Sequence, residues 1–244
     1  GMAEGLGAEI AATFARTGYD VVGLARSGRA AENVRALVEQ AGGAYTHLAC
    51  DVTRSADVAL ALKPFAGRVD VLVHNAHALL IKPFAETTTV EFEHVWRVAC
   101  LGAMICAQTV IPHMAARGRG TVILTGATAA IRGGANFSAF ASAKFALRGL
   151  AQSLAREFWP KGVHVAHVVL DGLIDEGQSA QRFDASASWQ VYPQATASSY
   201  LDPPRQAPSA WRLDTSVVPI AVRFVEHVMP DQRSKCVVDL RVVM

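Results

Sequence analysis

Short apolar runs alternate along the chain with longer stretches in which apolar residues recur every three to four positions. The short runs are almost continuously apolar, which is typical of strands covered on both faces. Candidate strands are Asp20–Ala25, Ala44–Leu48, Val69–Val73, Thr121–Thr125, Val163–Leu170 and Cys236–Leu240. Helical patterns occupy about 5–17, 29–41, 54–62, 88–117 and 137–159. This alternation predicts an α/β fold with a doubly wound parallel sheet.

Two further features of the pattern bear on the organisation of the chain. In the last helical pattern, Leu147, Leu150, Leu154 and Phe158 recur at helical spacing and predict a stripe that faces the core. From Asp175 to about Val217 the periodicity lapses and Ser, Ala, Pro and Gln accumulate, so no element is predicted there. The length of 244 residues suits a single domain over 1–244.

Composition and charge exclude several classes of protein. Hydrophobic residues make up 51% and charged residues 18% of the chain, which excludes general disorder. The net charge of +2 gives no face for nucleic acid. The four cysteines have no paired spacing, so neither a disulfide framework nor a metal site is expected. Uninterrupted apolar runs reach only about ten residues, too short for a bilayer, and no signal peptide is visible. These observations predict a cytoplasmic protein without a membrane segment.

A glycine pattern opens the first helical stretch. Gly1, Gly5 and Gly7 have the spacing G-x-x-x-G-x-G. Glycines there let the backbone approach a pyrophosphate at the positive end of a helix dipole, although for the glycines alone plain helix capping is the favoured explanation. A phosphate loop of this kind should follow a strand, and the sequence given starts at Gly1. We therefore expect the first, central strand of the sheet to be missing from the chain.

Later segments repeat a known order of motifs. Asp51-Val52 follows one candidate strand, Asn75-Ala76 follows the next, and a helix carries Phe140-Ala-Ser-Ala-Lys144. Together with the glycines, they resemble the short-chain dehydrogenase/reductase family over about residues 1–175. The resemblance implies a Rossmann-type three-layer α/β/α domain with strand order 3-2-1-4-5-6-7. It also implies NAD(P)(H) binding, carbonyl/alcohol hydride transfer on a small molecule, a homodimer or homotetramer, and an irregular substrate loop at 176–217.

The resemblance assigns the contacts of the cofactor residue by residue. His74 and His77 depart from the ends of the family's Asn-Asn-Ala-Gly turn, and His77 replaces a glycine near the nicotinamide ribose. A structural role is favoured for both, as for His164 and His167 on a predicted strand. The implied cofactor-binding residues are Gly1, Gly5, Leu6 and Gly7 in the phosphate loop, Asp51 and Val52 at the adenine, and Asn75, Ala76, Lys144, Gly172 and Ile174.

The choice between the two dinucleotides is predicted from the end of the candidate strand at 20–25. NAD-type sites place a carboxylate there, about 20 residues after the glycines. This chain has Ala25, followed by Arg26 and Ser27. Because a guanidinium suits a 2′-phosphate, NADP(H) is favoured over NAD(H). Two observations keep the alternative open: Arg26 could be merely solvated, and Glu4 would repel a phosphate unless it points outward.

The positions that carry catalysis in the family are substituted. The family mechanism uses a tyrosine as proton donor, a lysine one helical turn later, a serine and an asparagine. Here the tyrosine position is Phe140, the serine position Ala127 and the asparagine position Ala99, and only Lys144 is retained. Phenylalanine has no proton to donate. Because general acid catalysis supplies about 10²–10⁴-fold, these substitutions exclude family-typical turnover by the usual route.

Neighbouring polar residues are possible substitutes. Thr128 and Ser138 adjoin the substituted positions, and Asp171 or Asp175 could donate a proton if burial raised its pKa. A structural role is favoured for each. Thr128 is adjacent to its substituted position on an extended segment, so its side chain points the other way, and the two-residue offset of Ser138 on a helix turns its side chain by about 200°.

Three interpretations of function follow: an NADP(H)-dependent oxidoreductase with rearranged catalytic groups, a catalytically inactive nucleotide-binding partner or sensor, and a truncated product. Self-association is expected through the helical patterns at 88–117 and 137–159. The small residues Ala141, Ala151 and Ala155 are expected to permit close approach of helices there.

Overall fold

The computed structural model describes residues 5–174 and 190–217. Gly1, Glu4, Asp175 and the predicted strand Cys236–Leu240 lie outside the described residues. Four of the predicted helices agree with the structure to within a few residues at each end. These are α1 (Leu6–Ala15), α2 (Ala31–Gln40), α3 (Ser55–Leu62) and α6 (Ser138–Phe158).

The five predicted strands that fall on described residues are all present. They are β1 (Val21–Ala25), β2 (Tyr45–Ala49), β3 (Val71–His74), β4 (Gly120–Thr125) and β5 (Val163–Leu170). The sequence pattern misses β8 (Asp214–Val217), because Asp214 and Ser216 alternate with buried residues on this edge strand. Two short strands, β6 (Leu173–Ile174) and β7 (Gln190–Val191), pair with each other away from the larger groups.

The strands pair in parallel throughout, in two hydrogen-bonded groups. β1 pairs with β2, and the second group has the order β3-β4-β5-β8. Within each group the order agrees with the Rossmann-like order that the resemblance implies, 3-2 for the first group and 4-5-6-7 for the second. Among the described residues no strand pairing joins β1 to β3.

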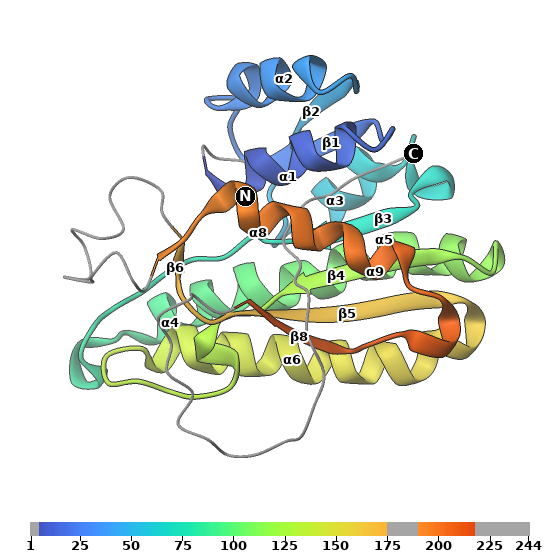
Figure 1. Cartoon of the computed structure of the whole chain (residues 1–244). Helices are drawn as coiled ribbons and strands as arrows, with labels where there is room; N and C mark the ends of the chain where they lie inside the picture. The colour runs from blue at the N-terminus through green and yellow to red at the C-terminus, as the bar shows by residue number, and fades with distance from the viewer. Residues whose placement is uncertain (1–4, 175–189, 218–244) are drawn as a thin grey trace.

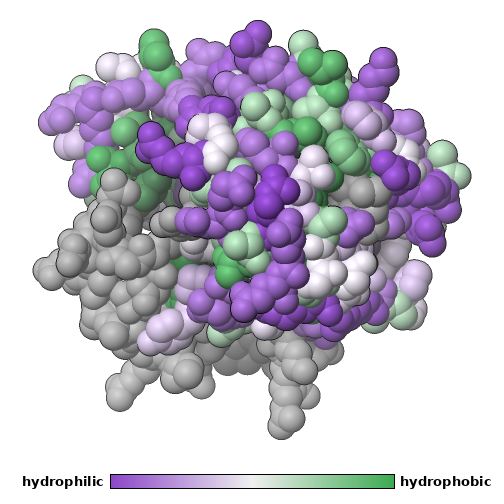
Figure 2. All heavy atoms as spheres, turned by 90° about the horizontal axis from the view of Figure 1, so that it is seen from above, coloured by the Kyte–Doolittle hydropathy of each residue, from purple (hydrophilic) through white to green (hydrophobic). Residues whose placement is uncertain are grey.

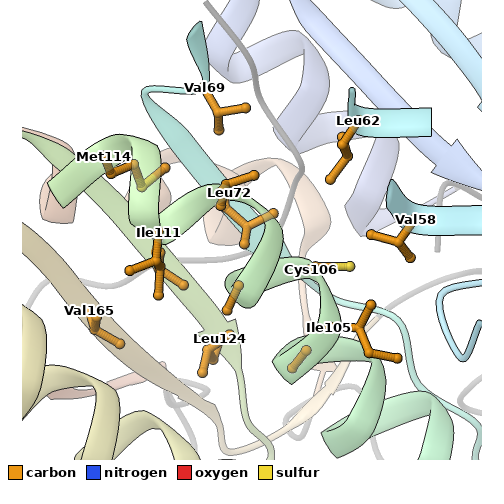
Figure 3. Packing of buried hydrophobic residues seen from close by; sticks show 14 of the residues in the cluster. Val58, Leu62, Val69, Leu72, Ile105, Cys106, Ile111, Met114, Leu124 and Val165 are labelled. Atoms are coloured by element: carbon orange, nitrogen blue, oxygen red, sulfur yellow. The ribbon is translucent and has the colours of Figure 1, made fainter. Parts of the chain in front are cut away.

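Side chains that alternate along the strands contribute to two hydrophobic clusters, one on each face of the sheet. One cluster joins α1 and α2 to the sheet, and it includes Phe14, Val73 and Tyr200. The other joins α3, α5 (Gly102–Ala116) and α6 to the opposite face, with Leu72 and Leu124 among its members (Figure 3). The result is three layers with the strands in the middle (Figure 1). Seen from above, the outer face carries mostly hydrophilic side chains, with scattered hydrophobic ones (Figure 2).

The segment after β7, for which the sequence predicts no element, completes the first layer. It forms two short helices, α8 (Pro193–Ser198) and α9 (Asp202–Arg205), joined by the 3-10 turn Ser199–Leu201, and a further 3-10 turn at Pro208–Ala210. α8 lies beside α1 (Figure 1), and Gln194 Nε2 donates to Glu9 Oε1 over 3.1 Å. Packing against distant elements, and not local periodicity, therefore determines the structure of this segment.

The helix predicted over 88–117 is interrupted. It consists of α4 (Thr89–Trp96), a π-helical turn (Arg97–Leu101) and α5 (Gly102–Ala116). By length and average apolarity the stretch from Thr89 to Ala116 could cross a bilayer, although its uninterrupted apolar runs are short. Of its most apolar window, 56% is buried inside the protein. The stretch is therefore a core helix of this domain.

The apolar stripe of α6 differs from the predicted one. Leu147 is fully buried, but Leu150, Leu154 and Phe158 are only partly buried. The positions that face the core are Ala143, Leu147, Ala151 and Ala155, which recur every four residues. The expectation that Ala141, Ala151 and Ala155 lie at a contact between subunits is therefore wrong: all three side chains are buried within this chain.

Candidate functional site

The residues expected to bind a cofactor follow the carboxyl ends of parallel strands. Arg26 follows β1, Asp51 follows β2, Asn75 follows β3, Ala127 follows β4 and Asp171 follows β5. Carboxyl ends of parallel strands meet at one edge of a sheet, which is where open α/β sheets bind their ligands. The fold therefore gathers most of the predicted site residues at one edge.

The glycine loop leads into the N-terminus of α1. Gly5 has a φ of 109°, a conformation that residues with a side chain rarely adopt. Leu6 and Gly7, which follow it, are buried in the first turn of the helix. Backbone N–H groups in a first turn have no partner within the helix, so this end of α1 can bind an anion.

Arg26, Ser27 and Asp51 lie at the ends of the paired strands β1 and β2. The Asp51 carboxylate accepts hydrogen bonds from the Thr53 backbone N–H (2.9 Å) and hydroxyl (2.8 Å). The Thr53 backbone, and more weakly the Arg26 and Arg54 guanidinium groups, hold the pKa of Asp51 below its ordinary value despite some desolvation. Arg26 itself is exposed. A guanidinium that is open to solvent thus accompanies the Asp51 carboxylate at this corner.

Lys144 is a buried polar group of the candidate site. Its residue is only 2% exposed, and its Nζ donates to the Thr125 carbonyl oxygen over 2.7 Å. The same Nζ lies 5.7 Å from the centroid of the Phe140 ring, close enough for a cation–π contact. Phe140 is 9% exposed. The lysine therefore has the position that the resemblance predicts, but a hydrocarbon ring stands where a phenol is expected.

The other two substituted positions are also in apolar surroundings. Ala99 is fully buried in the π-helical turn, and Ala127 is extended and partly buried after β4. Both belong to the hydrophobic cluster around Phe140. His74 ties the end of β3 to this turn, since its Nε2 lies 3.3 Å from the Val98 carbonyl oxygen. Asn75 and Ala76 follow directly and are partly buried.

Two of the suggested substitutes, Thr128 and Asp171, interact with each other. The Thr128 hydroxyl donates to Asp171 Oδ1 over 2.6 Å, and Arg132 Nη2 donates to the same oxygen over 2.9 Å. The ion pair joins the loops that follow β4 and β5. Gly172 comes next, and Ile174 packs partly buried against the cluster of α1. The Thr128 hydroxyl and this carboxylate oxygen are thus engaged within the protein.

Sequence reasoning missed two contacts near Lys144. The Tyr200 hydroxyl lies 3.3 Å from Thr125 Oγ1, but Tyr200 is 0% exposed, so this phenol has no access to a substrate. The second contact is between His77 and Phe140, whose ring centroids are 6.3 Å apart and edge to face. No sequence signal indicates Tyr200, because its segment lacks periodicity. His77 could be noticed as a departure from the family motif.

The histidines of β5 are structural, as predicted. Nδ1 and Nε2 of His164 lie 3.0 Å and 2.9 Å from the carbonyl oxygens of Pro203 and Arg212, so the one N–H of the neutral ring donates to one of them. His167 bonds Asp214 of β8 over 2.8 Å. Among residues 5–174 and 190–217, no group of His, Cys, Asp or Glu side chains is placed to hold a metal ion.

Comparisons with known proteins agree with this geometry. The family model described as short chain dehydrogenase matches residues 1–184. L-2,3-butanediol dehydrogenase of Corynebacterium glutamicum is 32% identical over 195 residues, 77% of this chain and 74% of that protein. Overall, the chain spans about two thirds of the length of the curated relatives it matches.

Solved structures show the same fold. A metagenomic short-chain oxidoreductase in complex with NADP is 26% identical, with a TM-score of 0.76, 88% of this chain covered and 92% of that one. A 7α-hydroxysteroid dehydrogenase complexed with NADH and 7-oxo glycochenodeoxycholic acid is also 26% identical, with a TM-score of 0.77 and coverages of 88% and 89%. The chain therefore belongs to the short-chain dehydrogenase family.

Proposed function

We propose that this protein binds NADP(H) in preference to NAD(H) on a family-type oxidoreductase site, but reduces carbonyl compounds far more slowly than its relatives. One observation carries the proposal. Lys144 is buried and bonded to Thr125, while the ring beside it is the hydrocarbon ring of Phe140. The site therefore retains the lysine of the family but lacks the tyrosine phenol whose pKa this lysine would lower.

The residues present fit a dinucleotide. Gly5 adopts a backbone conformation suited to glycine at the N-terminus of α1, where an anion is favoured. Arg26 presents an exposed guanidinium after β1, where the adenine ribose would lie. Lys144 can additionally contact the ribose next to the nicotinamide. Similar solved structures contain one or the other dinucleotide, since one holds NADP and another holds NADH.

The missing step is proton donation. A bound NADPH would supply the hydride for a carbonyl carbon. The carbonyl oxygen needs a proton at the same time, and Phe140 and Ala127 have neither a proton to give nor a hydrogen bond to donate. A general acid contributes about 10²–10⁴-fold and one oxyanion donor about 10²–10³-fold, in a non-additive way. We therefore place turnover several orders of magnitude below the family range.

An assay of the unmutated protein tests this directly. NADPH oxidation should be followed with a panel of simple ketones and aldehydes, with protein-free and carbonyl-free controls. The expected rate equals that of the controls. Carbonyl-dependent turnover of about 1 s⁻¹ or faster, the range of ordinary enzymes, would contradict the proposal and shift the role of donor to His77, Thr128 or Asp171.

A second candidate function is that of a nucleotide-binding partner or sensor without chemistry. The observation that favours it is the apolar cluster in which Ala99, Ala127 and Phe140 pack together. Such packing stabilises the fold whether or not hydride transfer occurs. A dinucleotide that raises the melting temperature, in a protein with no turnover on any carbonyl tested, supports this function over the first.

We also propose that the protein self-associates. We further propose that it is cytoplasmic, lies in no membrane and binds a small-molecule ligand. An apolar groove lies between α5 and α6. Such a groove suits a two-fold contact with a second copy. It is lined by Met104, Ala107, Gln108, Ile111, Pro112, Leu150, Leu154 and Phe158.

We expect Met104→Glu to convert dimers or tetramers into monomers at micromolar concentration, because a charge in an apolar contact loses its hydration. Gln40→Glu adds the same charge on the exposed face of α2 and serves as the control. Light scattering measures the mass. A strictly monomeric unmutated protein would refute the two-fold contact.

A further inference from the structure

A fixed carboxylate lies where the loops after β4 and β5 meet. Arg132 Nη2 and the Thr128 hydroxyl both donate to Asp171 Oδ1, over 2.9 Å and 2.6 Å. The Asp171 backbone N–H donates to the Val217 carbonyl oxygen of β8 over 2.8 Å. Backbone and side chain of Asp171 are therefore both held in place, one by the sheet and the other by the loop after β4.

The two charges of this ion pair differ in their exposure to solvent. The Asp171 side chain is 12% exposed, whereas the Arg132 side chain is 56% exposed. Water and salt screen an exposed charge more strongly than a buried one, so Arg132 offsets the negative charge only in part. In the part of the chain that the structure describes, Asp171 Oδ2 accepts no hydrogen bond. The carboxylate thus leaves a net negative field on its open side.

The carboxylate lies at the reactive end of the candidate site. Thr128, which donates to it, directly follows Ala127, the position at which the family holds the oxygen of its substrate. Lys144 donates to the carbonyl oxygen of Thr125 in the last position of β4. The proposed function places the nicotinamide ring beside these residues, because hydride leaves the ring towards the substrate. The charge of Asp171 therefore acts on the nicotinamide end of a bound dinucleotide.

The two redox states of the dinucleotide differ in charge at this end. The nicotinamide ring is positively charged in NADP⁺ and neutral in NADPH. A nearby carboxylate therefore attracts the oxidised ring and has much less effect on the reduced one. The Lys144 ammonium and the Arg132 guanidinium act in the opposite sense. A variant that changes only Asp171 leaves both cations in place, so it isolates the contribution of the carboxylate.

We propose that Asp171 selects for the redox state of the ligand: its carboxylate strengthens the binding of NADP⁺ relative to NADPH, and Arg132 moderates this preference. The proposal rests on the proposed function, because it requires a dinucleotide at this site. It requires no turnover. A carboxylate in this role is ionised, so it does not donate the proton that Phe140 lacks.

The test compares the dissociation constants of NADP⁺ and NADPH for the whole protein, with no carbonyl compound or alcohol present. NADPH is followed by its fluorescence, and NADP⁺ by its displacement of NADPH. Asp171→Asn removes the charge but keeps an oxygen that can accept from Thr128 and Arg132. It should lower the affinity for NADP⁺ relative to NADPH by about 5–30-fold, the effect of one charge in a partly solvated site.

Arg132→Gln removes the opposing charge and should change the ratio in the other direction, by about 2–5-fold because this side chain is exposed. General damage to the fold weakens both forms alike and cannot produce opposite changes. Glu157→Gln neutralises an exposed carboxylate that is paired with Lys161 at the end of α6, so it is the matched control and should leave the ratio unchanged. The probe 2′,5′-ADP lacks the nicotinamide and should bind equally to every variant.

If the dinucleotides bind but the ratio is unchanged in Asp171→Asn, or shifts in the same direction in both variants, the proposal is overturned and the proposed function stands. If Asp171→Asn does not fold, Arg132→Gln decides alone, and an NADP⁺ preference that fails to rise overturns the proposal. If neither dinucleotide binds to the folded, unmutated protein, the proposed function and this inference are both contradicted.

Discussion

Phe140→Tyr combined with Ala127→Ser should restore carbonyl reduction to at least about 10²-fold above the unmutated protein, the lower end of what a general acid supplies. The tyrosine hydroxyl would stand one helical turn from Lys144, whose Nζ already lies 5.7 Å from the ring centroid. The positive charge would lower the pKa of the new phenol from about 10 towards neutrality. The serine would hold the carbonyl oxygen.

Each single substitution should give little. Phe140→Tyr alone leaves the substrate oxygen unheld, and Ala127→Ser alone leaves it without a proton, which is the non-additivity of groups that act as a unit. Steady-state NADPH oxidation by the four proteins provides the measurement, with circular dichroism to confirm that each is folded. Phe145→Tyr, at an exposed position on the same helix, is a control for the addition of a phenol and should have no effect. Full rescue by one substitution would show that the two positions do not form one catalytic unit.

Arg26→Ala should weaken NADPH binding by about 10–150-fold, because a charge-assisted bond to phosphate contributes about 1.5–3 kcal/mol. NADH has no 2′-phosphate, so its affinity should hardly change. The preference for NADPH over NADH should therefore disappear, because only the affinity for NADPH falls. Arg26 follows β1 and contributes to the lowered pKa of Asp51, and the family resemblance leads us to expect the adenine ribose at this strand end.

Competition between NADPH and NADH in the unmutated and Arg26→Ala proteins measures this effect. Arg156→Ala removes an exposed guanidinium from α6, away from the strand ends, and should leave both affinities unchanged. If the two cofactors bind equally well to the unmutated protein, or if Arg26→Ala leaves the NADPH affinity intact, Arg26 does not select the cofactor.

Local pattern was sufficient to predict the strands that are buried on both faces, because their apolar runs are continuous. It failed at β8, where polar residues alternate with buried ones and pairing with β5 determines the strand. It also assigned Ala151 and Ala155 to an interface, although α6 turns these alanines towards the sheet. Which face of an apolar helix meets the core depends on its neighbours, and these are not encoded in its own periodicity.

In the candidate site, too, some contacts could be predicted from the sequence and others could not. Motif positions placed Lys144 and Phe140 together because they lie on one face of one helix, four residues apart. The ion pair of Asp171 with Arg132 joins two loops, and only the parallel order of β4 and β5 brings these loops together. The edge-to-face contact between His77 and Phe140 likewise depends on where β3 ends relative to α6. Contacts between loops thus required the structure.

The central claim is that the protein binds a dinucleotide but lacks a proton donor. An equilibrium titration of the unmutated protein with NADPH and NADH, followed by cofactor fluorescence, tests this claim most directly. Binding should be saturable, with NADPH bound more tightly than NADH, and the enhanced fluorescence should persist when a ketone is added, because no hydride is consumed. Absence of saturable NADPH binding to the folded protein would contradict the cofactor site itself. Loss of the fluorescence on adding the ketone would mean that hydride is transferred. It would contradict the claim that the protein lacks a proton donor because Phe140 stands at the position of the family's tyrosine.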